Sequence, residues 1–169
     1  MMSPMHEQPQ GAAFDVVLLL HVGCVVAGFA TTVTAATTAG RLHRLLGAGS
    51  PLPEALRRYF RPGVNWAGRA VYGIPVFGFA LVAMSQGAYA VTDGWILAGL
   101  VLFVALALVA EVVLWPAERR VQAAFVRSAG DRHPLSDPVV GAAATTMARA
   151  ASVALVLLIA GTVVMIAQP

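Results

Sequence analysis

The sequence predicts an all-α integral membrane protein, a four-helix bundle with up-down topology. Of its 169 residues, 59% are hydrophobic and only 11% are charged. A water-soluble domain usually carries about 25% charged residues, so this chain has too little polar surface to cover one. The apolar residues gather into long segments, and every arginine lies outside them. These predicted spans are residues 14–39, 70–91, 94–115 and 150–167.

Each predicted span is long enough, or nearly so, for a hydrocarbon core of about 30 Å at about 1.5 Å per helical residue. Lipid offers the backbone no hydrogen-bond partners, so each span must be a helix. The strict alternation that a β-barrel needs is absent. The flank before Phe14 lacks Lys and Arg, and span 14–39 is longer than the apolar part of a signal peptide. We therefore interpret it as a span that is not cleaved.

The arginines predict the orientation. The chain has 11 basic residues, all of them arginine, and they occupy only the connections 40–69 and 116–149. Positive charge favours the cytoplasmic side, so both connections are expected inside and both termini outside, in one membrane domain covering 1–169. Arginine-only basicity with heavy alanine use is typical of GC-rich bacterial genomes. This predicts a multi-pass protein of a bacterial plasma membrane, with lipids as partners and no role for nucleic acid.

The first connection is expected to contain a short helix that lies on the inner leaflet. Leu52, Leu56, Tyr59 and Phe60 share one helical face. Three arginines fall mainly on the remaining surface and are candidate ligands of anionic headgroups: Arg57, Arg58 and Arg61. The alternative is an ordinary basic loop that only sets the topology.

The second connection is expected to continue the third span as a helix that breaks at Gly130, with turn residues to Pro138. Within the second span, Pro75 removes one backbone hydrogen bond and is expected to kink the helix, with Gly73 and Gly78 easing the bend.

His21 and Cys24 are the unusual residues of the first span. With Gly28 and Thr32 they form one stripe at helical spacing, so we expect His21 to face the second and fourth spans rather than lipid. Met84 and Met165 belong to the same outer half of the bundle. His21 and Cys24 are candidate metal ligands, and the two methionines are candidate cofactor-binding residues. Such soft ligands suit copper, and His with Met is a haem pairing. The alternative is a packed core in which a hydroxyl or carbonyl satisfies the histidine.

Glu111 is an acid inside the cytoplasmic half of the third span. A carboxylate there must be neutral or paired, and Arg69 and Arg149 begin neighbouring spans on the same side. We expect a structural ion pair with one of them. The alternative is a proton-relay group.

Residues 18–23, 94–122 and 152–169 together resemble the small bacterial four-span membrane proteins catalogued as domain of unknown function 2269. That family is similar to copper-resistance D-type membrane domains and to a bacterial membrane-bound protoporphyrinogen oxidase, a haem-associated protein with a histidine in its first span. The resemblance implies the four-span architecture and haem b or copper as candidate cofactors. Only His21 matches a residue of the oxidase pattern, which also has a lysine that this chain lacks.

The sequence leaves three functions open. No nucleotide-binding or common zinc motif is present, and no acid, base and nucleophile converge, so an enzyme is the less favoured class. The leading hypothesis is a non-catalytic accessory or assembly subunit of a larger membrane complex, or a self-associating bundle. A haem- or copper-binding protein that uses His21 is the alternative, and a small transporter is the third.

Overall fold

The computed structural model describes residues 11–128 and 138–167, all in helices and their connections. The elements in chain order are α1 (Ala12–Gly47), α2 (Glu54–Tyr59), α3 (Trp66–Arg69), the 3₁₀ segment η1 (Ala70–Tyr72), α4 (Gly73–Met84), α5 (Gly94–Val109), the π-helical segment η2 (Ala110–Leu114), α6 (Trp115–Ser128) and α7 (Pro138–Ala167).

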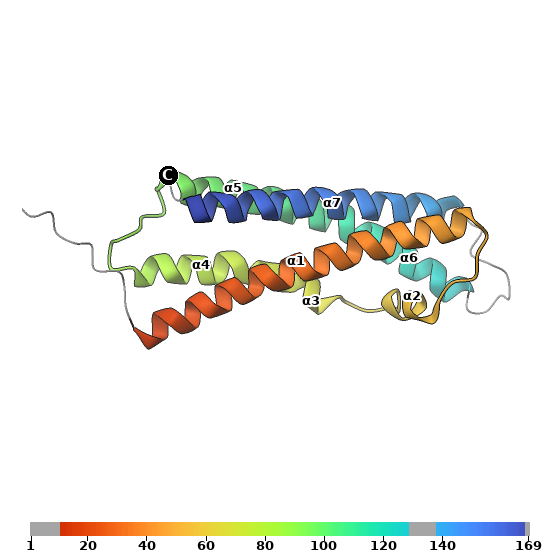
Figure 1. The fold of residues 1–169 in the computed structure, drawn as a ribbon, viewed down its shortest axis with the longest axis horizontal. Coiled ribbons are helices and arrows are strands. Elements are labelled where there is room, and N and C mark those ends of the chain that lie inside the picture. The colour runs from red at the N-terminus through yellow and green to blue at the C-terminus, as the bar shows by residue number, and fades with distance from the viewer. Residues whose placement is uncertain (1–10, 129–137, 168–169) are drawn as a thin grey trace, which may run out of the picture.

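Among the described residues, 4 continuous helices are long and apolar enough to cross a membrane. They are Ala12–Gly47, Trp66–Met84, Gly94–Ser128 and Pro138–Ala167. The predicted all-α bundle of four spans is therefore confirmed. Figure 1 shows that α1 begins and α7 ends at the same end of the bundle, which we call the terminal end. The opposite end, where α1 and α6 finish, carries the connections rich in arginine and is called the arginine-rich end.

The second span differs from the predicted 70–91 at both ends. It begins at Trp66, where the Asn65 side-chain oxygen accepts a hydrogen bond of 3.1 Å from the Gly68 N–H. It ends at Met84, because the backbone turns back through Gln86 at φ 52° and Gly87 at φ 87°. Left-handed backbone ends a helix. The apolar residues 88–91 had extended the prediction past this turn.

The two basic connections are more helical than predicted. α1 continues past Ala39 to Gly47, and α7 begins at Pro138 rather than at residue 150. The predicted helical extension of the third span is confirmed as α6. Pro138 suits the first helical position, because its missing N–H has no partner there. The predicted break at Gly130 lies outside the described residues.

Pro75 does not kink the middle of a long helix. It lies in the first turn of α4, directly after η1, and the missing N–H of proline is tolerated at that position. The change from α3 to the 3₁₀ turn provides the irregularity instead, so α4 is a short helix of 12 residues.

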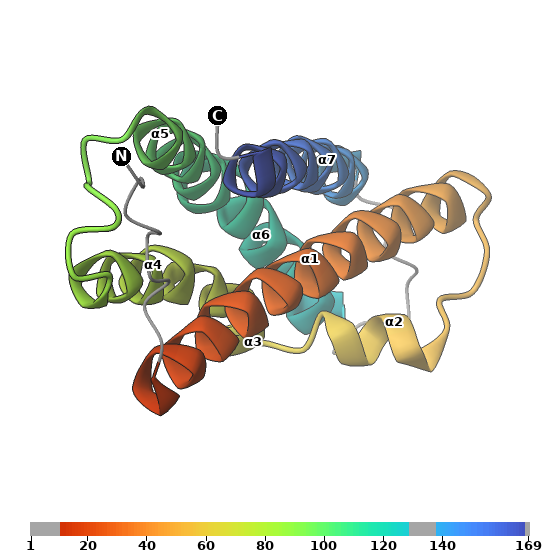
Figure 2. The ribbon, with the colours of Figure 1, turned by 60° about the vertical axis from the view of Figure 1, so that its left-hand side comes forward.

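α1 is the central packing helix, because it contacts both α7 and α4, while α5 packs on α7. Figures 1 and 2 show that α4 and α5, although consecutive in the sequence, lie apart on opposite sides of the terminal end. The contacts of α4 are mainly with α1 and η1. No residue of α4 is fully buried, so this half of the bundle is loosely closed.

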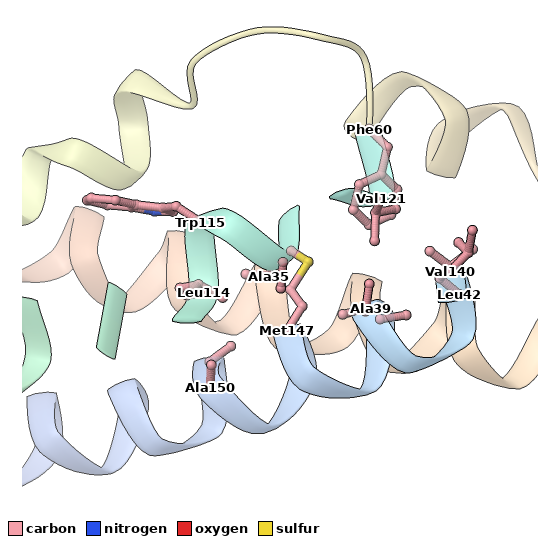
Figure 3. Packing of buried hydrophobic residues seen from close by; sticks show 14 of the residues in the cluster. Ala35, Ala39, Leu42, Phe60, Leu114, Trp115, Val121, Val140, Met147 and Ala150 are labelled. Atoms are coloured by element: carbon pink, nitrogen blue, oxygen red, sulfur yellow. The ribbon is translucent and has the colours of Figure 1, made fainter. Parts of the chain in front are cut away.

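The arginine-rich end holds the main core. Residues of α1, α2, α6 and α7 meet there (Figure 3). Small side chains on α7 bring the helices close, and Met147 fills the space between them. The fully enclosed alanines of this core are Ala39, Ala144 and Ala151. This compact half fixes the spans, whereas the terminal half leaves room between them.

Candidate functional site

His21 lies in the looser terminal half and faces α4, as predicted. Its Nδ1 is 2.9 Å from the Ile74 carbonyl oxygen, across the interface between α1 and α4. Gly78 allows this approach, since a Cβ there would be 3.4 Å from His21 Cε1. A larger side chain at residue 78 would push the imidazole away. A carbonyl thus bonds one of the two ring nitrogens, as the packed-core alternative expected, and Nε2 has no hydrogen bond within the described part of the chain.

Two apolar cavities flank His21. One has a volume of about 360 Å³ and the other about 350 Å³. The residues that line both are His21, Ile74, Gly99, Phe103 and Met165. The first cavity lies between α4 and α5, where these helices stand apart, and the second lies between α1, α5 and α7. His21 is therefore a polar side chain at the boundary of two otherwise mainly apolar spaces.

The predicted soft ligands are brought together only in part. Met165 lines both cavities beside His21, with its methyl group against Gly99. Cys24 lines neither cavity, because its sulfur packs against the backbone of Gly73. Met84, at the end of α4, also lines neither. Within the described chain, no three His, Cys, Asp or Glu residues are grouped to hold a metal ion. Of the four candidates, only His21 and Met165 border a common space.

Glu111 has a different partner from the one predicted. The Tyr72 hydroxyl donates a hydrogen bond of 2.7 Å to Glu111 Oε1. Arg69 instead places its guanidinium 4.5 Å from the centre of the Trp115 ring, a cation–π contact. In the part of the chain that the structure describes, Glu111 forms no ion pair with Arg69 or Arg149. The prediction of an ion pair was wrong, because Arg69 contacts the Trp115 ring and the Tyr72 hydroxyl is the hydrogen-bond partner of the carboxylate.

The surroundings of Glu111 are unusual for a carboxylate. It lies in η2, the π-helical segment, and its side chain is exposed on the outer surface of the span. Val112 beside it is 67% exposed. Glu111 precedes Trp115 by one helical turn, about 6 Å along the axis. The carboxylate is therefore on the outer surface of the bundle, close to the arginine-rich end of the third span. Single π-helical turns occur frequently at functional positions.

Sequence reasoning missed a second acid, Glu118, which is only 7% exposed. The Asn65 side chain lies beside its carboxyl group, and both residues line two water-sized cavities together with Trp115. Gln122, one turn further, donates a long hydrogen bond of 3.5 Å to the Gly63 carbonyl. Helical spacing from Trp115 through Glu118 to Gln122 could have revealed this inward face.

The sequence predicted that the apolar face of the short helix α2 would lie on lipid. In the structure this face packs against the protein instead. Leu56 and Phe60 are buried in the main core, and the Phe60 ring stacks on Phe125 of α6 with a centroid distance of 5.4 Å. The amphipathic pattern is therefore satisfied by α6 rather than by the membrane. The candidate lipid ligands Arg57, Arg58 and Arg61 remain exposed on the outside of this unit.

The chain matches none of the models of protein families, the curated proteins or the solved structures with which it was compared.

Proposed function

We propose that this chain is an accessory subunit of a larger assembly in the bacterial plasma membrane, with a non-catalytic role. The observation that carries the proposal is the exposed carboxylate of Glu111 on the membrane-facing side of η2. The non-catalytic part rests on the sequence, in which no acid, base and nucleophile converge.

An ionisable group that faces hydrocarbon is costly, and such groups normally face a protein partner or a water-filled space. Tyr72 supplies one hydrogen bond to Glu111 Oε1 and leaves the rest of the carboxylate exposed. A neighbouring transmembrane helix with a hydrogen-bond donor or a cation would satisfy the remaining oxygen. Val112, the next residue along η2, is also exposed and would add apolar contact area. We call the surface formed by Tyr72, Glu111 and Val112 the Glu111 face.

Site-specific photo-crosslinking tests this role. A photo-activatable residue is placed at Val112 on the Glu111 face or, as the control, at Val156 on α7, which is 63% exposed. We expect a crosslinked species of defined mass from residue 112, lost after Glu111→Gln, and none from residue 156. A product of twice the chain mass identifies the self-associating bundle. A protein that stays single in native-lipid nanodiscs, with no crosslink from residue 112, contradicts both forms of the proposal.

The second candidate function is a haem-binding protein that uses His21. The observation that favours it is the hydrogen bond from Nδ1 to a carbonyl, which is how proteins commonly orient a ligating imidazole. Met165 borders the same cavities and would be the second ligand. A visible spectrum and a metal analysis of the purified protein test this function. Loss of a Soret band in His21→Ala would support it, and a colourless, metal-free protein would contradict it.

A further inference from the structure

The cavities beside His21 are large enough to hold a small molecule. Small-molecule sites in proteins have volumes of about 300–1,000 Å³. The two cavities have about 360 and 350 Å³, and each is lined mainly by apolar and aromatic side chains. Both are bordered by membrane-spanning helices, so a ligand would enter from the lipid phase.

The hydrogen bond of His21 fixes which of its nitrogens is available to a ligand. The Ile74 carbonyl can only accept, so the proton must be on Nδ1 of the imidazole. In the neutral ring, Nε2 then carries a lone pair and acts as an acceptor. The bond to Ile74 uses Nδ1, and His21 has no second hydrogen bond among the described residues. Because His21 lines both cavities, we infer that this nitrogen can accept a hydrogen bond from a ligand that carries a donor.

The residues that line the first cavity include Tyr89 and Trp95, at the terminal end of the bundle, as well as His21. Tyr89 and Trp95 stand at its outer part, with their rings in edge contact at 5.6 Å. Phe103 lies eight residues after Trp95 on α5, about 12 Å along the helix, and also lines this space. His21 is seven residues after Phe14, the predicted outer boundary of the first span. At about 1.5 Å per residue, its acceptor nitrogen is therefore about 10 Å inside that boundary.

This position restricts the chemistry of the occupant. A charged lipid headgroup would not be stable so deep in the membrane. An acyl chain would fill the space but would leave Nε2 without a partner, which is unfavourable. A neutral ring with a hydroxyl group satisfies both requirements. Its ring can pack against the aromatic side chains of Phe79 and Phe103, while its hydroxyl donates to His21.

We propose that these cavities bind a lipid-soluble hydroquinone, whose hydroxyl donates a hydrogen bond to Nε2 of His21. The reduced form is preferred, because the oxidised quinone has only acceptors and cannot donate to this nitrogen. The inference goes beyond the role as an accessory subunit and does not depend on it, since the cavities and the Glu111 face are separate places on the molecule.

Calorimetric titration of the full chain in nanodiscs of neutral lipid tests the proposal. The probes are decylubiquinol, its dimethyl ether and decylubiquinone. We expect the hydroquinone to bind about fivefold to tenfold more tightly than the other two, the effect of one hydrogen bond. His21→Phe keeps a ring in the wall and removes the acceptor, so all three probes should bind this variant equally.

Two further variants sharpen the result. Gly78→Leu would place a side chain against the His21 ring and should weaken binding of the hydroquinone. Met84→Leu is the matched control, because Met84 is in the same helix and lines neither cavity. Equal affinity of the unaltered protein for the hydroquinone and its dimethyl ether would overturn the proposal. A Soret band in the protein as purified, lost in His21→Phe, would also overturn it, because iron would occupy Nε2.

Discussion

The sulfur of Cys24 on α1 packs directly against the backbone of Gly73, the first residue of α4. This contact lies one helical turn from the pairing of His21 with Ile74. These two contacts fix the packing of α4 against α1. Cys24 therefore has a packing role at the point where the second span changes from 3₁₀ to α-helix.

Gly73→Ala should destabilise the protein by about 1–3 kcal/mol, the usual cost of overpacking. A Cβ at residue 73 would overlap Cys24 Sγ and would be 3.3 Å from the Phe77 ring. Thermal unfolding in detergent measures the loss. Removing the sulfur with Cys24→Ala should recover most of it, so the two changes should be strongly non-additive.

Gly23→Ala is the control for this pair. Residue 23 is next to Cys24, but a Cβ there meets nothing within 4 Å. Alanine also favours a helix over glycine by about 1 kcal/mol, so this variant should be neutral or slightly more stable. If Gly73→Ala and Gly23→Ala behave alike, α4 is not held against α1 at Cys24.

The spans and the inward face of α1 could be predicted because they depend on local patterns. Apolar length predicts a membrane helix, and the stripe from His21 through Gly28 and Thr32 predicts its buried side. Gly28 and Thr32 are indeed buried in α1. The end of the second span was missed because Ala88, Ala90 and Val91 continue the apolar composition past a turn that depends on two left-handed residues.

The partners of polar groups could not be predicted from spacing alone. Tyr72 is 39 residues before Glu111, so their hydrogen bond depends on how η1 and η2 pack. An amphipathic pattern such as that of α2 indicates an apolar partner without distinguishing lipid from protein. Phe60 found that partner in Phe125 of α6. Glu118, in contrast, could have been found from helical periodicity.

The predicted orientation can be tested with reporters at both ends of the bundle. Because α1 begins and α7 ends at the terminal end, a reporter fused after Pro169 should be active outside the cytoplasm. A reporter inserted at Ser50, between α1 and α2, should be active only in the cytoplasm. Activity on the opposite sides would mean that the arginine-rich end faces outward.

The exposed arginines of α2 are predicted to bind anionic lipid in the intact protein. Each arginine near an anionic surface contributes about 1 kcal/mol, and the effect weakens in salt. Phosphatidylglycerol in nanodiscs should therefore raise the Tm of the protein relative to neutral lipid. Replacing Arg57, Arg58 and Arg61 with Gln should remove most of that gain without changing the Tm in neutral lipid. An unchanged gain would leave these arginines with a role in topology alone.

Tyr59 packs its hydroxyl into the core without a hydrogen-bond partner among the described residues. A buried polar group without a partner costs about 1–3 kcal/mol. Tyr59→Phe should therefore raise the free energy of unfolding by about 1 kcal/mol, measured by thermal or denaturant unfolding. Tyr72→Phe is the informative contrast, because it removes a hydroxyl that donates to Glu111, and it should lower stability.

Tyr59→Phe should also change how the stability of the protein depends on alkaline pH. Burial, and then the negative charge of Glu118, raise the pKa of the Tyr59 phenol above its usual value of about 10. The folded state therefore holds its proton more tightly than the unfolded state does. Stability is unaffected by this group below about pH 10 and falls above it, because the unfolded phenol loses its proton first. Tyr59→Phe lacks this loss, so its advantage over the unaltered protein should widen from pH 10 upward. A constant difference between the two proteins across this pH range would show that the Tyr59 hydroxyl is not buried in the folded protein.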